Sequence, residues 1–450
     1  MPDTHDRAAI AAVRAAATRL EGTPRDFDRL LASIGDARYV LLGEASHGTH
    51  DFYRTRAEIT KRLIREKGFR AVAMEADWPD AYRLNRYVRG HPADADAIEA
   101  LAGFRRFPQW MWRNADVLDF VGWLREYNES LPDRRPKVGM YGLDVYSLHA
   151  SIDAVLAYLR RVDPEAARRA ERRYACFDHF GRDPQAYGYA ATLGLSASCE
   201  AEVVHQLVEL RASAAEYARR DGRQEPDDLF FAEQNARVVT SAERYYREMF
   251  ISGAGSWNLR DRHMVETLGA LTGFLEGQDP VPKIVVWAHN SHLGDARATA
   301  MHMRGEVNVG QLVRERAGTG AYLVGFTTHS GTVTAASDWD APAERKRVRP
   351  ALAGSYEALF HECASRNFYL DLRASTEAAD VLTRPRLERA IGVIYRPDTE
   401  RVSHYFQASL TRQFDALLHY DRTRAVEPLE RTAAWEEGEV EVPETYPSTL

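Results

Sequence analysis

The chain is poor in cysteine. Only three cysteines, Cys176, Cys199 and Cys363, occur in 450 residues, and they lie far apart without the spacing of a metal-binding motif. An odd and sparse set of this kind is typical of a reducing cytoplasm. We therefore expect three small buried side chains and a cytoplasmic protein.

An excess of positive charge and a long apolar run are also lacking. The 59 lysines and arginines face 66 aspartates and glutamates, and the net charge of −7 offers no general basis for holding nucleic acid or an anionic membrane. No apolar stretch approaches the roughly 20 residues that span a bilayer, and the first residues do not resemble a secretory signal. We expect neither a nucleic-acid nor a membrane partner. The apolar fraction of 45% is typical of a soluble globular protein.

Four short apolar runs are the most informative feature of the chain. They occupy residues 39–43, 71–74, 138–142 and 284–288. Runs of this length, separated by helical patterns, predict buried parallel strands. Each is followed by a polar residue that can do acid–base chemistry, in turn Glu44, Glu75, Asp144 and His289. Because ligands bind beyond the carboxyl ends of such strands, these side chains should converge at one edge of the sheet.

The pattern of the whole chain predicts an α/β fold, with a largely parallel central sheet flanked by helices and a large helical insertion. Strand signals vanish over residues 151–250, where helical spacing dominates. Further strands are expected at residues 322–327, 368–372 and 390–395. We divide the chain into the N-terminal part of an α/β catalytic domain (1–150), the helical insertion (151–250), the C-terminal part of the α/β domain (251–425) and a loosely held acidic tail (426–450).

Arg56 falls on the apolar side of a predicted helix over residues 50–66. Its stripe on a helical wheel also contains Phe52, Ile59 and Leu63. A buried guanidinium is unfavourable without a partner, so Arg56 requires a carboxylate, and Glu44 and Glu75 are the candidates at the strand ends. The alternative is an arginine at the helix edge whose charged end reaches solvent.

Two pairs of polar residues with a spacing of three lie at the expected sheet edge. Glu44 and His47 occur in the turn 43–48, where a glycine at each end permits a tight backbone turn. His289 and His292 directly follow a predicted strand. Each of these residues alone is more often structural, but their conjunction indicates a functional site.

Two chemistries fit these residue types. Histidine nitrogens and carboxylate oxygens bind zinc and other divalent ions. A histidine oriented by a carboxylate can instead activate a water molecule, because imidazole titrates near neutral pH. A buried Arg56 would add positive charge where a dication would also sit, which favours a site without a metal. We therefore expect no metal and no other cofactor.

Ser46 invites comparison with serine hydrolases. The turn 43–48 does not have the Gly-x-Ser-x-Gly spacing of a nucleophile elbow, so Ser46 is not expected to be a nucleophile. The glycines of the chain also form neither a Rossmann nor a P-loop fingerprint.

Together, these residues make the sequence similar to the erythromycin esterases. The resemblance rests on the turn 43–48, Arg56, Glu75 and the segment 287–292, and it extends over about residues 35–420. It implies a hydrolase that opens a lactone ester by attack of water, without a metal and without a covalent intermediate. In that reaction His47 would be the general base, with Glu44 ordering the base.

The resemblance implies roles for the other side chains too. Arg56 would help to order the base and its water, and Glu75 would complete the charged cluster. His289 and His292 would position the ester or assist the leaving alcohol. Contacts with the substrate are expected from Trp110, Trp112, Arg113, Asp144 and Asn290.

The prediction is therefore a carboxylic ester hydrolase that acts on a small-molecule, macrolide-like ester or lactone and confers macrolide resistance. Two alternatives use the same residues. One is a divalent-metal-dependent hydrolase that employs the glutamate and histidine cluster. The other is a non-enzymatic protein that binds haem or iron.

Overall fold

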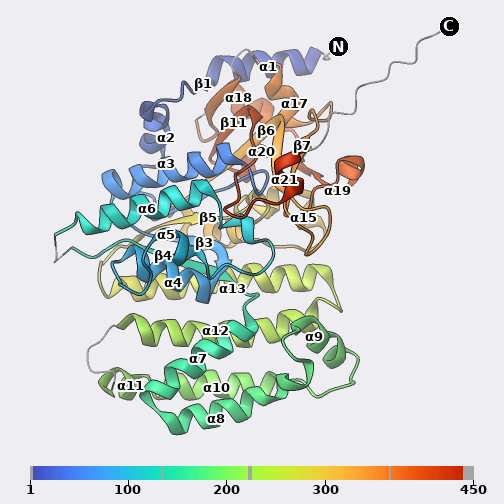
Figure 1. The fold of residues 1–450 in the computed structure, drawn as a ribbon. Helices are drawn as coiled ribbons and strands as arrows, with labels where there is room; N and C mark the ends of the chain where they lie inside the picture. Colours follow the sequence, from blue (N-terminus) through green and yellow to red (C-terminus); the bar gives the residue numbers. More distant parts are fainter. Residues whose placement is uncertain (1–3, 133–134, 221–225, 364–365, 375, 439–450) are drawn as a thin grey trace.

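A nine-stranded sheet forms the centre of the protein (Figure 1). The computed structural model describes residues 4–132, 135–220, 226–363, 366–374 and 376–438. The strands follow the order β1-β8-β11-β6-β2-β5-β3-β4, with β7 paired to β6. Their bounds are Thr18–Arg19 (β1), Tyr39–Leu42 (β2), Phe69–Asp77 (β3), Gly139–Asp144 (β4), Lys283–Trp287 (β5), Ala321–Ala335 (β6), Glu344–Val348 (β7), Asn367–Asp371 (β8) and Ala416–Thr423 (β11).

The strands from β11 to β4 run parallel to one another, whereas β1, β7 and β8 pair antiparallel. Leu42 at the end of β2 lies opposite Trp287 of β5 on one side and Val324 of β6 on the other. The predicted α/β fold with a largely parallel sheet is confirmed. The four apolar runs form the neighbouring strands β2, β5, β3 and β4, so their carboxyl ends lie at one edge of the sheet.

One predicted strand is absent, and one strand of the sheet was not predicted. Residues 390–395 form no strand and make only isolated bridges, of which one joins Ile391 to Ser46. The regular pairing lies just before them, where β9 (Arg386–Arg389) pairs with β10 (Tyr405–Ala408), and Gly392 interrupts the apolar run. The central strand β11 was not anticipated, because its apolar stretch is short and continues into charged residues.

Helices cover both faces of the sheet. Val40 and Leu42 of β2 belong to a hydrophobic cluster with α3 and α6, whereas Leu41 belongs to a second cluster with α1, α13 and α16. This alternation follows from the opposite directions of successive side chains in a strand. The helices that flank the sheet include α1 (Thr4–Ala16), α2 (Asp28–Ile34), α3 (His50–Lys67), α4 (Trp78–Val88), α5 (Ala97–Leu101), α6 (Ala115–Glu129), α13 (Gly253–Glu276), α14 (Asn290–Leu293), α16 (Val309–Ala317), α17 (Tyr356–His361) and α18 (Glu377–Leu382).

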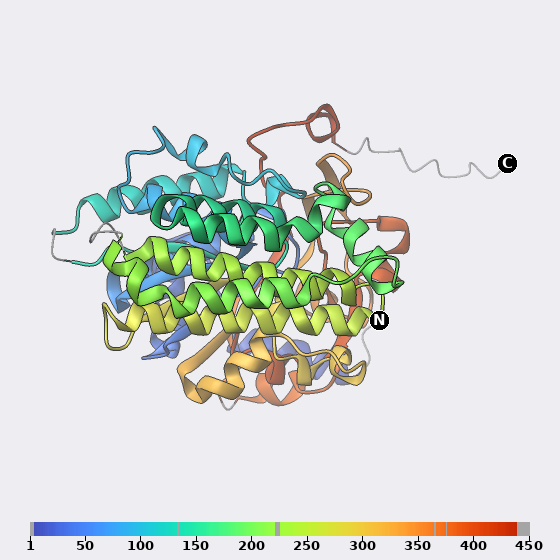
Figure 2. The same ribbon diagram turned by 90° about the horizontal axis from the view of Figure 1, so that it is seen from below.

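A helical layer lies beyond α13, on the side of the molecule away from α1 (Figure 1). Its long helices run side by side when the molecule is seen from below (Figure 2). The layer has its own hydrophobic cluster, so the expected concentration of helices after residue 150 is present, whereas the division into domains stays a prediction. Its α-helices are α7 (Leu148–Val162), α8 (Pro164–Tyr174), α9 (Pro184–Thr192), α10 (Glu200–Ala212), α11 (Ala214–Arg220) and α12 (Pro226–Glu248).

Two of the cysteines form a disulfide within this layer. Cys176 is bonded to Cys199, which caps the start of α10, and Cys363 is free and buried. The expectation of three unpaired cysteines was therefore wrong. Disulfides are typical of oxidising compartments, so the pairing counts against a cytoplasmic location, which stays a prediction. In the described part of the chain, none of the helices combines the length and the apolar character needed to cross a bilayer.

The segment that follows β11 packs against the protein as far as residue 438. Trp435 of α21 (Ala433–Glu437) is only 8% exposed, and the carbonyl of Glu427 accepts a hydrogen bond from the amide of Ala115. The expected acidic tail from residue 426 is therefore not loosely held in this part. Residues 439–450 lie outside the described residues.

Candidate active site

The turn 43–48 follows β2 at the carboxyl edge of the sheet, and other segments hold its backbone. The amide of Asn290 donates to the carbonyl of Glu44 at 2.8 Å, and the amide of His47 donates to the carbonyl of Ile391 at 3.0 Å. Both side chains of the turn that were predicted to be functional are therefore carried on a fixed backbone.

Glu44 lies between His47 and Arg56. Its Oε1 atom lies 2.8 Å from Nδ1 of His47, and its Oε2 atom lies 2.9 Å from Nη2 of Arg56. Glu44 and Arg56 are both 0% exposed, so Arg56 points inward as predicted and pairs with one of the two expected carboxylates. The guanidinium pairs by charge rather than by an aligned hydrogen bond, and it also lies over the rings of Tyr53 and Trp287.

The rings of His47 and His289 face each other across the sheet edge, with centroids 4.8 Å apart. Nδ1 of His289 accepts a hydrogen bond from the amide of Ser291 at 3.2 Å, so in the neutral ring the proton is carried by Nε2. This Nε2 atom is buried without a hydrogen-bond partner. Burial, reinforced by the neighbouring His47, holds the pKa of His289 well below its ordinary value. His289 is thus an uncharged ring that lies near the backbone of Ala45, and its Nε2–H group makes no aligned hydrogen bond.

His47 presents the opposite group. Its Nδ1–H faces the Glu44 carboxylate, which leaves Nε2 as the nitrogen with a lone pair in the neutral ring. Of the six side chains predicted to be catalytic, His47 is also the most exposed, at 6%. One acceptor nitrogen and one donor N–H therefore come together at the end of the sheet.

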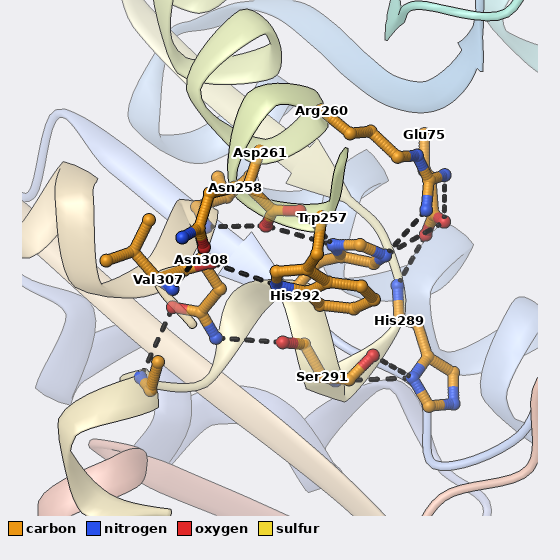
Figure 3. A network of polar contacts seen from close by, with 12 residues as sticks. Glu75, Trp257, Asn258, Arg260, Asp261, His289, Ser291, His292, Val307 and Asn308 are labelled. Atoms are coloured by element: carbon orange, nitrogen blue, oxygen red, sulfur yellow. Dashed lines mark hydrogen bonds and ion pairs between the residues drawn. The ribbon is translucent and has the colours of Figure 1, made fainter. Parts of the chain in front are cut away.

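Glu75 fixes the backbone of His289 and contacts a cation. Its Oε2 atom accepts the amide hydrogen of His289 at 2.9 Å, and its Oε1 atom accepts from Nη2 of Arg260 at 2.7 Å (Figure 3). Burial acts to raise the pKa of Glu75, but His292, Arg260 and His47 outweigh it and hold the pKa well below its usual range. The carboxylate is therefore ionised.

His292 lies behind His289, against α13. Its Nδ1 atom lies 3.0 Å from both oxygens of Asp261, and its ring stacks on Trp257 with centroids 4.4 Å apart (Figure 3). Burial and Arg260, whose Nη1 lies 2.9 Å from Nε2 of the ring, act to lower the pKa of His292. The carboxylates of Asp261 and Glu75 have the larger combined effect, so the pKa lies above its ordinary value.

Two of the residues predicted to contact substrate have partners inside the protein. Asp144, which ends β4, accepts hydrogen bonds from Nε and Nη2 of Arg260 at 2.9 and 2.6 Å and is 2% exposed. Asn290 is fully buried and donates through Nδ2 to the carbonyl of Phe326. Both side chains are thus used in contacts inside the protein, with Arg260 and with the backbone of Phe326.

The other three predicted substrate contacts lie on the far side of the turn. Trp110 packs against Gly48 and borders a cavity of about 340 Å³ between the segments 105–110, 340–343 and 428–432. Trp112 packs against Tyr53 and is 5% exposed. Arg113 forms an ion pair with Glu430. Trp110 alone of the three touches the turn that carries His47, so a substrate role for these residues stays a prediction.

The oxygens that could hold a metal already have partners. Those of Glu44 contact His47 and Arg56, and those of Glu75 contact Arg260 and the amide of His289. Within the described residues, no group of three or more histidine, cysteine or acidic side chains is arranged to hold a metal ion.

The sequence interpretation missed the contribution of α13. Arg260 joins Glu75 to Asp144, and Asp261 holds His292, yet neither was predicted to belong to the site. The signal was present, because both lie on the apolar stripe of α13, which also contains Met264, Leu268 and Leu271. A helical wheel, which identified Arg56 as an inward-pointing charge, would also have identified Arg260 and Asp261.

Comparisons with known proteins identify a family and proteins of the same fold. A family model described as Erythromycin esterase matches residues 64–423. The erythromycin esterase type II of Escherichia coli is 21% identical over 418 residues, which are 89% of this chain and 93% of that protein. A solved succinoglycan biosynthesis protein covers 95% of this chain and 100% of its own, with a TM-score of 0.77 and 21% identity. A solved mutant of the erythromycin esterase EreC in its open conformation matches 92% of this chain and 99% of its own, with a TM-score of 0.66 and 18% identity. The two solved structures share the fold.

Proposed function

The chain belongs to the erythromycin esterase family, and on this premise we propose that it hydrolyses a carboxylic ester or lactone, with His47 as the base that activates water. Family membership supports an ester hydrolase with a small-molecule substrate. A macrolide-like lactone is the proposed substrate class, because the Escherichia coli relative is an erythromycin esterase. Macrolide resistance would be the consequence of that activity.

The facing rings of His47 and His289 carry the proposal. Hydrolysis of an ester by water needs an acceptor for the proton of the water and a donor for the oxygen on which negative charge develops. Nε2 of His47 is the acceptor and Nε2–H of His289 is the donor, and the ring centroids lie 4.8 Å apart.

The reaction follows from these positions. As the water oxygen bonds to the carbonyl carbon, Nε2 of His47 takes a proton from the water. The oxyanion of the tetrahedral intermediate is stabilised by the N–H of His289. When the carbon–oxygen bond to the alcohol breaks, the imidazolium of His47 returns its proton to the departing oxygen. An acid and an alcohol leave, and His47 is neutral again.

Glu44 and Arg56 keep the base ready for this cycle. The carboxylate of Glu44 holds the proton of His47 on Nδ1 and stabilises the imidazolium that forms during attack. Arg56 pairs with the other oxygen of Glu44, which fixes the carboxylate in a site that excludes water.

The surroundings of His289 involve Glu75, Arg260 and His292. Glu75 holds the amide of His289, and Arg260 holds Glu75 against Asp144. A neutral His289 is the useful form, because its N–H donates to an oxyanion while the ring keeps no charge that would bind an anion permanently. The low pKa of His289 supports this role.

A panel of lactones and esters that includes macrolides tests the proposal. Purified protein is incubated with each compound in water enriched in heavy oxygen, and the products are analysed by mass spectrometry. A gain of one water, with the label in the new carboxylate, is expected for at least one compound. Cleavage without water gain would contradict hydrolysis. No cleavage of any compound, together with a haem-like visible absorption spectrum, would favour the binding-protein alternative.

A further inference from the structure

Gly48, the neighbour of His47, is held by two amides from separate parts of the chain. Its carbonyl accepts from the amide of Thr334 at 3.0 Å and from the amide of Val426 at 2.9 Å. Its φ of +68° is a conformation that favours glycine. A Cβ atom added there would lie 2.1 Å from the carbonyl oxygen of Thr334, so the turn and β6 are in close contact.

A chain of hydrogen bonds connects these two amides to the C-terminal segment. Nε1–H of Trp435 donates to Oγ1 of Thr334 at 2.7 Å, and that hydroxyl donates to the carbonyl of Val426 at 2.6 Å. Because Oγ1 accepts from the indole, its own hydrogen is directed at Val426. Thr334 and Val426 are 0% exposed and Trp435 is 8% exposed, so water does not replace these bonds.

The segment between β11 and α21 runs along the turn. The amide of His50 donates to the carbonyl of Arg424 at 2.8 Å, and Thr49 forms a bridge with Ala425. The start of α21 is capped by Thr432, which places Trp435 one helical turn later, over β6. The end of the chain that the structure describes therefore reaches the residue beside the proposed base.

We infer that Trp435 and Thr334 are positioning residues for His47, and that the segment 424–437 is part of the machinery of the reaction. Removal of the Thr334 hydroxyl leaves the indole N–H of Trp435 and the carbonyl of Val426 without a partner. Removal of the indole N–H takes away the bond that directs the hydroxyl at Val426, so either change weakens the hold on Gly48. His47 then loses its fixed placement relative to His289. Rates are sensitive to displacements of this kind even when the reacting groups themselves are intact. The kinetic part of the inference depends on the proposed function.

Matched variants separate positioning from folding. Thr334→Val removes the hydroxyl at nearly constant volume, whereas Thr334→Ser keeps it. Trp435→Phe removes the indole N–H but keeps an aromatic ring. Trp123→Phe is the control on α6, where the indole is partly buried and packs against Tyr127.

We expect Thr334→Val and Trp435→Phe to lower kcat about tenfold with KM unchanged. Thr334→Ser and Trp123→Phe should keep kcat within about twofold, a change too small to matter on this scale. The double variant Thr334→Val/Trp435→Phe should be no slower than Thr334→Val alone, because both changes break the same chain of bonds. Equal kcat for Thr334→Val and Thr334→Ser would overturn the inference.

Hydrogen exchange measured by mass spectrometry provides a readout that needs no substrate. Peptides that cover residues 43–53 should exchange faster in Thr334→Val and Trp435→Phe than in the two controls. If the wild-type protein cleaves no compound but this difference is present, the proposed function fails and the hydrogen-bonded connection stands. Unchanged exchange in both variants would contradict the connection itself, and faster exchange with unchanged kcat would reduce it to a structural role and overturn the positioning claim.

Discussion

Nδ1 of His47 lies 2.8 Å from Oε1 of Glu44, three residues earlier in the same turn. In the proposed reaction, a single local segment therefore supplies both the base and the carboxylate that orients it. The distant Arg56 completes the arrangement by pairing with the other oxygen of Glu44. The proposed oxyanion donor, His289, comes from the neighbouring strand end.

Replacement of His47 tests the role of the base. His47→Asn keeps a polar group of similar size but cannot accept the proton of the water at a basic nitrogen. Turnover should fall by about two to four orders of magnitude, the usual contribution of a general base. Steady-state kinetics measure the loss, and circular dichroism checks that the variant is folded.

Ser46 provides the control in the same turn. Its Oγ atom is hydrogen-bonded to Oγ1 of Thr49 and the residue is 1% exposed. Ser46→Ala should keep most of the activity, and no acyl adduct should appear in intact-mass spectra during turnover. An adduct on Ser46 would replace direct attack by water with a covalent mechanism.

Arg260 should also be sensitive to substitution. Arg260→Lys keeps the charge but cannot bridge Glu75 and Asp144 with a planar group, so the backbone of His289 becomes less firmly held. We expect kcat to fall about tenfold to a hundredfold. Arg262→Lys, at an exposed position of the same helix, is the matched control. Equal activity of the two variants would show that the bridge is dispensable.

Local patterns were enough to predict the strand end at Glu44 and the inward direction of Arg56. The apolar run before Glu44 and the glycines of the turn identified a strand end, and the helical wheel placed Arg56 inside the protein with a carboxylate partner. These inferences depend only on the period of a helix or strand and on the unfavourable burial of an unpaired charge.

Contacts between distant segments could not be predicted in the same way. Glu75 and Arg260 are 185 residues apart in sequence, and nothing local states that β3 and α13 meet. The disulfide between Cys176 and Cys199 could not be predicted either, because the spacing of cysteines alone does not specify which of them pair. Packing of α13 against the sheet decides the first contact, and packing within the helical layer decides the second.

We predict that activity does not require a metal, because the carboxylates of the site are already paired with arginines. Arg56 and Arg260 already neutralise Glu44 and Glu75, so a dication would have to displace a guanidinium from each carboxylate. Activity should survive treatment with EDTA or phenanthroline followed by gel filtration. A loss that zinc or manganese restores would support the metal-dependent alternative.

The disulfide should stabilise the helical layer. Cys176 and Cys199 are separated by 23 residues, and closure of a loop of this length contributes about 3 kcal/mol on the loop-entropy model. Cys199→Ser should lower the midpoint of thermal unfolding, and mild reduction should do the same in the wild-type protein. Two alkylated cysteines that appear only after reduction would identify the bond by mass spectrometry. Alkylation of both without reduction would contradict it.

Glu388 is a fully buried acid that lies beside the side chains of Gln413 and Asn290. Burial, reinforced by the negative charge of Glu357, raises the pKa of Glu388 from 4.5 to about 8. In the unfolded chain the same group ionises near its ordinary value. Between these two values the folded protein binds a proton that the unfolded chain has released, so stability falls as the pH rises through this window and becomes constant above about pH 8.

Glu388→Gln should remove this dependence, because the amide resembles the protonated acid in size and never ionises. Thermal unfolding followed by fluorescence at several pH values tests the sign. The variant and the wild type should unfold at similar temperatures below the lower end of the window, and the variant should be the more stable of the two above its upper end. Glu362→Gln, at an exposed position just after α17, should follow the wild type throughout. A variant that is less stable than the wild type above about pH 8 would mean that Glu388 is ionised and paired in the folded protein.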